Sequence, residues 1–403
     1  MSLTVCIAPA NTVGYPNGGG HMWVYLQWAL ALRAAGCRVI WLEGIDLDDG
    51  HDSPAARNRQ RSGGGSPRNC VATLRERLAA FGLSDELSLY VMNEPAAKIP
   101  PEVAQGAMNL DAASEADLFL NLWHSTPAAV VQRFRRTAFI DTDPGLLQVW
   151  MTRGDIQVPP HDIHFTIGET VGRQDALFPD CGRRWLYTPP PVFLPAWPVQ
   201  SPDAASAYTT VAHWWGGTFE YNGTVFQDAK RISFKEFADL PAHTSASLEL
   251  AVCLGTAGAG CRGLLEPRGW RVREAWDVTA TPEQYRTYVQ RSRGEFSCAK
   301  PSTIALQTAW ISDRSLCYLA SGKPVIVQHT GPSRILPDAA GFFRFRTLRE
   351  AADALAAAEA DYERHSREAR ALVAEHFDAQ RVVPRVLERA LEGGVGGRRD
   401  RAA

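Results

Sequence analysis

The 403-residue sequence has little net charge, few lysines, no closely spaced cysteine pair and no long apolar run. Its formal net charge of −2 gives no overall attraction for nucleic acid or an anionic membrane, so any phosphate must be recognised by a local group. Five residues are lysine and most positive charge is arginine, as a bacterial-like, GC-rich genome would produce. We therefore expect neither nucleic acid nor a membrane as a partner.

The eight cysteines are scattered, with no C-x-x-C pair and no spacing typical of a zinc site. This pattern predicts free thiols in a reducing, cytoplasmic compartment and no bound metal. His161 and His164 have no partner cysteines and are interpreted as structural. The most apolar expected helix, Met22–Ala35, is shorter than the roughly 20 residues that span a bilayer. No signal-peptide pattern precedes the first expected strand, which also favours a cytoplasmic location.

Residues 1–190 alternate strands and helices in the way typical of a Rossmann-like domain. The strand Leu3–Ala8, a glycine-rich turn, the buried helix Met22–Ala35 and the strand Cys37–Leu42 form one βαβ unit. The stretch 46–69 is rich in Gly, Ser and Arg and is expected to be a mobile surface loop. Further parallel strands are expected at Leu87–Val91, Asp117–Leu122, Thr137–Asp141 and His164–Gly168.

The stretch 191–206 is dense in proline and is expected to link two domains. Residues 207–376 repeat the alternation, a last helix over 377–392 is expected to pack back on the first domain, and the tail 393–403 is expected to be disordered. The expected strands are Tyr208–His213, Leu248–Cys253, Glu295–Cys298, Pro324–Gln328 and Phe342–Phe345, and the expected helices are Phe234–Asp239, Pro282–Ser292, Ser312–Ser321 and Leu348–His376. The predicted fold class is α/β, with two doubly wound Rossmann-like domains facing a cleft where ligands bind.

The stretch 310–345 is the most informative part of the chain. Ser312 is a typical N-cap, and Asp313 places a negative charge in the first turn of a helix that ends before Gly322. The apolar run Val325–Val327 then predicts a parallel strand covered on both faces. Loops with many free backbone groups thus lie at one edge of a sheet, where nucleotides and phosphates bind.

This stretch resembles the donor-binding half of glycosyltransferases with the two-Rossmann-domain GT-B fold. Members of that family end a helix in a small residue and glycine, enter a strand through x-Pro-Val, continue into a glycine-containing loop, and start the next strand with glycine and a hydrophobic residue. The matching segments here are Ser321–Val325, Thr330-Gly331 and Gly341-Phe342, and Gly18–His21 resembles the family's first-domain loop. The resemblance implies the GT-B fold, a nucleotide diphosphate sugar in the second domain, an acceptor in the first, and no metal or other cofactor.

The same segment departs from the family at two positions. Many retaining members carry two glutamates about a helix length apart, whereas Ala309 and Cys317 occupy those positions here. Asp313, Arg314 and Ser315 could replace them from one turn earlier. Whether transfer would retain or invert the configuration of the sugar is therefore left open.

Binding a diphosphate requires backbone donors or cationic side chains that stabilise the leaving group. Helix N-termini and glycine-containing loops supply backbone donors, and arginine and lysine supply charge. Lys300 follows an expected strand, whereas Arg314 either binds phosphate or pairs with a carboxylate as an ordinary helix residue. The candidate donor-site residues are Lys300, Ser312, Asp313, Arg314, Ser315, Thr330, Gly331, Ser333, Gly216 and Gly217.

His21 begins the first long helix and is the candidate base that would accept a proton from an acceptor hydroxyl. The alternative is a ring that caps or packs locally. Asp141, at the end of a strand, is the second catalytic candidate and would orient or support His21. Asp143 either contributes to the cleft or starts the next helix, and His124 follows another strand and is a further cleft candidate.

Small and aromatic residues complete the set of cleft candidates. Gly19 and Gly20 either let a ligand approach the backbone closely or only form a turn. Trp214 and Trp215 either stack on a sugar or aromatic acceptor or pack at the interface between the domains.

The sequence thus predicts a cytoplasmic glycosyltransferase that moves a sugar from a nucleotide diphosphate sugar to a hydroxyl-bearing small-molecule or glycan acceptor without a metal. Two alternatives remain open. The same fold could epimerise or hydrolyse a nucleotide sugar, which would release the nucleotide with no acceptor present. It could also bind a nucleotide sugar or glycan without turnover, which the missing glutamate pair favours.

Overall fold

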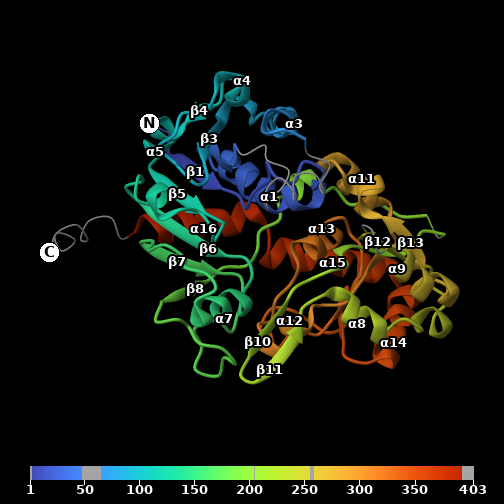
Figure 1. Cartoon of the computed structure of the whole chain (residues 1–403). Helices are drawn as coiled ribbons and strands as arrows, with labels where there is room; N and C mark the ends of the chain where they lie inside the picture. Colours follow the sequence, from blue (N-terminus) through green and yellow to red (C-terminus); the bar gives the residue numbers. More distant parts are fainter. Residues whose placement is uncertain (1, 48–64, 204, 255–257, 393–403) are drawn as a thin grey trace.

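The chain folds around two parallel sheets that come from successive parts of the sequence (Figure 1). The predicted α/β fold class, with two doubly wound Rossmann-like units, is confirmed. The computed structural model describes residues 2–47, 65–203, 205–254 and 258–392. Most of the predicted loop 46–69 and the whole predicted tail 393–403 lie outside the described residues. No helix within the described residues is both long and apolar enough to cross a bilayer.

The first sheet has eight strands in the order β4-β3-β2-β1-β5-β6-β7-β8, and each neighbouring pair is parallel. The order changes direction between β1 and β5, so the loops after these two strands open the crevice where α/β sheets bind ligands. The strands are β1 Thr4–Ala8, β2 Arg38–Ile45, β3 Leu87–Val91, β4 Met108–Asn109, β5 Leu118–Asn121, β6 Thr137–Asp141, β7 Ile163–Thr166 and β8 Trp185–Tyr187. The helices of this N-terminal unit are α1 Gly19–Ala34, α3 Pro67–Ala79, α4 Pro101–Ala104, α5 Leu110–Ser114, α6 Ala128–Val131 and α7 Leu146–Arg153.

The second sheet has six strands in the order β13-β12-β9-β14-β15-β16, again all parallel. Here the order changes direction between β9 and β14, and a two-stranded antiparallel hairpin, β10–β11, follows β9. The strands are β9 Tyr208–His213, β10 Thr218–Tyr221, β11 Thr224–Gln227, β12 Leu248–Cys253, β13 Arg271–Glu274, β14 Gly294–Ser297, β15 Val325–Gln328 and β16 Phe342–Phe345. The helices of this C-terminal unit are α8 Lys230–Glu236, α9 Gly258–Leu265, α10 Ala275–Thr279, α11 Pro282–Arg291, α12 Pro301–Leu306, α13 Asp313–Ala320, α14 Leu348–Ala360 and α15 Tyr362–His376.

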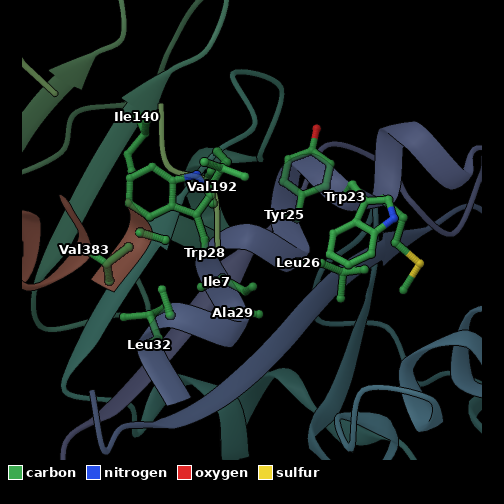
Figure 2. Close-up of a cluster of buried hydrophobic side chains, with 14 of the residues drawn as sticks. Ile7, Trp23, Tyr25, Leu26, Trp28, Ala29, Leu32, Ile140, Val192 and Val383 are labelled. Atoms are coloured by element: carbon green, nitrogen blue, oxygen red, sulfur yellow. The ribbon is translucent and has the colours of Figure 1, made fainter. Parts of the chain in front are cut away.

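The last helix, α16 (Ala379–Leu391), returns to the N-terminal unit. Figure 2 shows Val383 of this helix near Trp28 of α1, with Val192 and Ile140 around the same indole ring. All four side chains are buried, which explains why α1 is apolar nearly all round. The chain therefore crosses between the units twice, and the two crossings are paired, because the Val192 amide donates to Phe377 O at 2.8 Å and the Ala379 amide donates to Val192 O at 2.9 Å.

Some elements differ from the sequence prediction. The single helix expected over Leu348–His376 is two helices, because Asp361 leaves helical geometry and its side chain accepts the Arg364 amide as the N-cap of α15. The helix expected at Phe234–Asp239 begins earlier, at Lys230. Strands β4, β8, β13 and the hairpin β10–β11 were not predicted, since they are short or mostly exposed and lack a continuous apolar run.

Candidate active site

The carboxyl ends of strands from both sheets meet at an interdomain cavity of 60 Å³. Asp143, Pro144 and Leu146, which follow β6, line it from the N-terminal unit. The C-terminal unit contributes Lys230, Lys300, Thr303 and Trp310. Both units thus supply charged side chains to one enclosed space, at the edge where ligands bind open α/β sheets.

Two lysines and a histidine converge on this side of the C-terminal unit. The side chain of Lys230, at the start of α8, is buried, and its ammonium has no hydrogen-bond or ion-pair partner within the described residues. Burial, with Arg314 and Lys300 nearby, lowers the pKa of Lys230 to about 7. Lys300, which follows β14, lies 3.6 Å from a carboxylate oxygen of Asp228. The pKa of His213, at the end of β9, is lowered by desolvation and by the charges of Lys230 and Lys300.

Such a cluster is costly without a counter-charge, because like charges repel and a buried ammonium has lost its hydration. Asp228 supplies one negative charge, but its other oxygen accepts hydrogen bonds from the Ser302 amide and hydroxyl. An anion with more than one charge would relieve the remaining repulsion. Asp143 of the N-terminal unit lines the same cavity, and the two ammonium groups on its other side are suited to binding an anion such as a phosphate.

His21 of the N-terminal unit does not line the cavity, but it lies within electrostatic reach of Asp143 and His213. Its Nε2 lies 2.6 Å from Ala10 O, and a carbonyl oxygen only accepts, so Nε2 carries the proton and Nδ1 of the neutral ring is the free acceptor. Burial lowers the pKa of His21, which keeps the ring neutral near pH 7. The rings of Tyr15 and Tyr25 pack on either side, with centroids 5.5 and 5.2 Å away. His21 thus has the tautomer and charge that a general base requires.

Asp141 is fully buried and does not line the cavity, although it is a catalytic candidate from the sequence. Its carboxylate accepts Gln148 Nε2 and Thr166 Oγ1, each at 2.9 Å, and the Asp143 amide at 3.0 Å. Burial raises the pKa of Asp141 to about 7. The carboxylate that reaches the cavity is that of Asp143, and Asp141 holds the turn that presents it.

His124 follows β5 and is half-buried near the same carboxylate. Its Nδ1 lies 2.9 Å from Ser125 Oγ, and its ring packs at 6.0 Å from that of Trp150. The charge of Asp143 raises the pKa of both His124 and His21 against the larger lowering by burial. The structure therefore places two of the predicted residues, His21 and His124, within electrostatic reach of a third, Asp143.

Arg314 lies beneath the strand ends and does not face the interdomain cavity. Its Nε donates to Glu295 Oε1 at 2.5 Å, and its other nitrogens donate to Val211 O at 3.0 Å and Ser297 Oγ at 2.9 Å. Both members of the ion pair are buried. The guanidinium thus joins α13 to β9 and β14, which is the carboxylate-paired alternative considered from the sequence.

The N-terminus of α13 and the loop after β15 enclose a second, smaller cavity of 20 Å³. Ser312, Ser315 and Thr330 line it. Ser312 caps the helix by accepting the Arg314 amide, and the pKa of the half-buried Asp313 beside it is raised by burial. Gly331 has φ of 129° and lies against Gln307 O, where a Cβ would come within 2.5 Å, so this loop requires glycine.

Several predicted residues are used in contacts within the protein. Ser333 donates its hydroxyl to Glu169 of the N-terminal unit. A Cβ on Gly19 would come within 2.2 Å of Thr281 O, and one on Gly20 would meet the ring of Tyr285 at 2.6 Å. The close approach at Gly19 and Gly20 is therefore made by the C-terminal unit itself, which covers the N-terminus of α1.

The loop after β9 holds the remaining candidates. Trp214 is buried against Phe234 in the core of the C-terminal unit, with ring centroids 5.9 Å apart, and thus packs within one unit instead of at the interface between the domains. Trp215 is 43% exposed and stacks below the Arg231 guanidinium. Gly216 approaches the Asp228 backbone too closely for any Cβ, whereas Gly217 has open space around it.

His161 and His164 make protein contacts. His161 bonds to Asn121 Nδ2 at 3.2 Å and Pro159 O at 2.8 Å, and His164 Nε2 lies 2.6 Å from Arg183. No group of three or more potential metal ligands occurs in the described part of the chain.

Sequence reasoning missed Lys230, His213 and Asp228. His213 ends a correctly predicted strand, and Lys230 is one of only five lysines, so both carried a signal. Their convergence depends on β9 and β14 being neighbours in the sheet, which the sequence does not reveal.

No protein-family profile matches the sequence, and no curated protein matches it. Solved structures do match across nearly the whole chain. Sucrose-phosphate synthase from Thermosynechococcus elongatus is 12% identical, with 97% of this chain and 99% of that chain covered and a TM-score of 0.55. The chain has the GT-B fold.

Two further structures are similar in the same way. Anabaena HepE in complex with UDP and glucose is 12% identical, and the match covers 96% of this chain and 99% of the HepE chain with a TM-score of 0.55. An alpha-glucosyltransferase in complex with UDP and a 13-mer DNA is 11% identical, and the match covers 97% of this chain and 100% of that chain with a TM-score of 0.56. The GT-B architecture expected from the stretch 310–345 is thereby confirmed.

Proposed function

We propose that the protein is a glycosyltransferase that moves a sugar from a nucleotide diphosphate sugar to a hydroxyl-bearing acceptor. The observation that carries this proposal is the convergence of Lys230 and Lys300 on the interdomain cavity, opposite Asp143 of the N-terminal unit. It is supported by the GT-B fold of structures whose bound molecules include UDP and UDP-glucose.

The C-terminal unit, residues 207–376, would bind the donor. Lys230 and Lys300 would bind the diphosphate oxygens and stabilise the charge that develops on the leaving nucleoside diphosphate. Because two ammonium groups supply this charge, we propose that no metal or other cofactor takes part. The cavity at Ser312, Ser315 and Thr330 adds hydroxyls and a helix N-terminus on the same side.

The N-terminal unit, residues 1–190, would bind the acceptor. The acceptor oxygen forms a bond to the anomeric carbon, its proton passes to His21 Nδ1, and the bond between that carbon and the diphosphate oxygen breaks. Asp143 would orient the acceptor or the protonated histidine, and Asp141 would keep Asp143 in place. His124 is the second histidine within reach of that carboxylate.

Calorimetry with UDP, ADP and GDP and their glucose conjugates tests the donor site. Binding of at least one is expected, and binding of none would overturn the proposal. Release of the nucleoside diphosphate is expected only when an acceptor is present. Release without any acceptor would identify a hydrolase or epimerase instead, and tight binding without turnover on a panel of glycan and small-molecule acceptors would identify a binding protein.

A further inference from the structure

Glu43 is a fully buried carboxylate in the middle of the N-terminal unit that no step above uses. It lies on β2, and it accepts hydrogen bonds from the loop that joins β1 to α1. The Thr12 amide donates to Oε1 at 3.3 Å, the Thr12 hydroxyl donates to the same oxygen, and the Val13 amide donates to Oε2 at 3.4 Å. Trp41, two residues earlier on the same strand, donates its Nε1–H to Oε1 at 3.0 Å.

Every partner of Glu43 is a donor, so the site is built for a group that only accepts. Two tyrosines lie within electrostatic reach of Glu43, because its negative charge raises the pKa of both Tyr25 and Tyr90. Burial raises the pKa of Glu43 to about 7 in spite of the hydrogen bonds, which lower it. The buried Glu43 carboxylate therefore fixes the loop segment Thr12-Val13, which donates hydrogen bonds to it.

The loop held by Glu43 carries the carbonyl that selects the tautomer of His21. Ala10 lies two residues before Thr12, and its oxygen accepts from His21 Nε2 at 2.6 Å. Asn11, between them, has φ of 53°, so the backbone turns sharply from the carbonyl to the anchored segment. A shift of Thr12 and Val13 therefore moves the Ala10 carbonyl away from the imidazole.

We propose that Glu43 is a positioning residue that acts through Thr12 and Ala10 to keep His21 in the Nε2–H tautomer, with Nδ1 as the free acceptor. Its catalytic consequence rests on the proposed function, in which Nδ1 accepts the proton of the acceptor. The groups that face His21 from other elements are Asp143 and His213, and neither bonds to Nε2. Glu43 thus sets which ring nitrogen of His21 can accept a proton, whereas the charges of Asp143 and His213 change the pKa of that ring.

Two substitutions separate positioning from general damage. Thr12→Val and Trp41→Phe each delete one hydrogen bond to Glu43 Oε1, but only Thr12 belongs to the loop. The ¹⁵N shifts of His21 in the imidazole region of an NMR spectrum report its tautomer directly. We expect the Nε2–H form in wild type and Trp41→Phe, and a mixture of tautomers in Thr12→Val and Glu43→Gln. Unchanged shifts in Thr12→Val and Glu43→Gln would overturn the proposal, as would equal changes in Trp41→Phe.

Turnover and donor binding then test the catalytic consequence separately. Glu43→Gln should lower kcat by about 10- to 100-fold and shift the acidic limb of the pH profile, with donor affinity unchanged. Glu249→Gln is the matched control, because Glu249 is a buried carboxylate of the C-terminal unit that accepts Tyr288 and pairs with Arg273. A wild-type protein that binds no nucleotide would refute the proposed function and leave the NMR result to decide the positioning role. An equal loss of kcat in Glu249→Gln would overturn the positioning role of Glu43, because the loss would then not depend on the loop that contacts His21.

Discussion

Glu169 of the N-terminal unit accepts the Arg334 amide of the C-terminal unit at 3.0 Å, and the Ser333 hydroxyl donates to the same carboxylate. The Glu169 side chain is almost fully buried by this contact, and the Arg334 guanidinium lies 3.9 Å away. Together with the packing of α1 on Thr281 and Tyr285, this carboxylate holds the two units against each other beside the interdomain cavity.

Replacing Glu169 with glutamine should loosen that contact. Glutamine has one amide oxygen in place of two carboxylate oxygens, so one of the two part-buried donors, the Ser333 hydroxyl or the Arg334 amide, loses its acceptor at a cost of about 1–3 kcal/mol. We expect a larger radius of gyration by small-angle X-ray scattering in the absence of ligand. Asp175→Asn is the control, since Asp175 makes only an exposed pair with Arg173 in the same region. Identical scattering from Glu169→Gln and wild type would contradict the closing role.

Lys230→Met should weaken donor binding and stabilise the free protein at the same time. It removes a charge-assisted contact worth about 1.5–3 kcal/mol, so the affinity for a nucleotide sugar should fall about 10- to 100-fold. It also removes the ammonium of a buried side chain that Arg314 and Lys300 repel, so we expect Tm without ligand to rise by about 2–4 °C. The matched control is Lys235→Met on the exposed face of the same helix. Reduced stability with unchanged affinity would show that Lys230 is structural.

Donor affinity should depend on pH through Lys230. The pKa of this lysine is about 7 in the free protein, and a bound diphosphate raises it, so binding takes up a proton above pH 7. Affinity is therefore expected to be constant below pH 7 and to fall by up to about tenfold per pH unit above it. UDP-glucose is the suitable probe, because the terminal phosphate of UDP itself titrates near pH 6.

Calorimetry in two buffers of different ionisation enthalpy measures that proton directly. Uptake approaching one proton at pH 8 is expected for wild type, and none for Lys230→Met. Proton release, or equal uptake by both proteins, would assign the pH dependence to another group.

The Arg314–Glu295 pair should act as a unit in stability. Removing either partner leaves the other charged and buried, which costs about 3–5 kcal/mol of the free energy of unfolding. The double variant Arg314→Met with Glu295→Met should recover most of that loss. Urea unfolding of the two single variants and the double variant measures the coupling. Additive losses would contradict the pairing, and loss of donor affinity with full stability would restore Arg314 as a phosphate ligand.

The strands that the sequence located correctly share one property. Thr137–Asp141, Tyr208–His213 and Leu248–Cys253 are apolar or β-branched runs bounded by turn residues, and buried parallel strands require little else. Strand β8 has three residues, and the hairpin β10–β11 lies outside either main sheet and has no buried position. Neither has a pattern that distinguishes it from a loop.

The site was only partly predictable for a different reason. His21 and Lys300 each follow a recognisable element, so their place at a sheet edge could be inferred. The role of Arg314 depends on Glu295 lying beside it, and that of Lys230 on the order of the strands in the sheet. These are contacts between segments far apart in the sequence, which local patterns do not record.

The paired crossings at Val192 and Asp378 have a mechanical consequence. Two covalent connections that are bonded to each other at one place act as a pivot, and they resist both sliding and twisting of one unit against the other. The motion left for opening the interdomain cavity is a hinge rotation of one unit relative to the other, about an axis through Val192 and Asp378. Residues near the pivot would move little, whereas Glu169, Ser333 and Arg334 would separate as donor and product exchange.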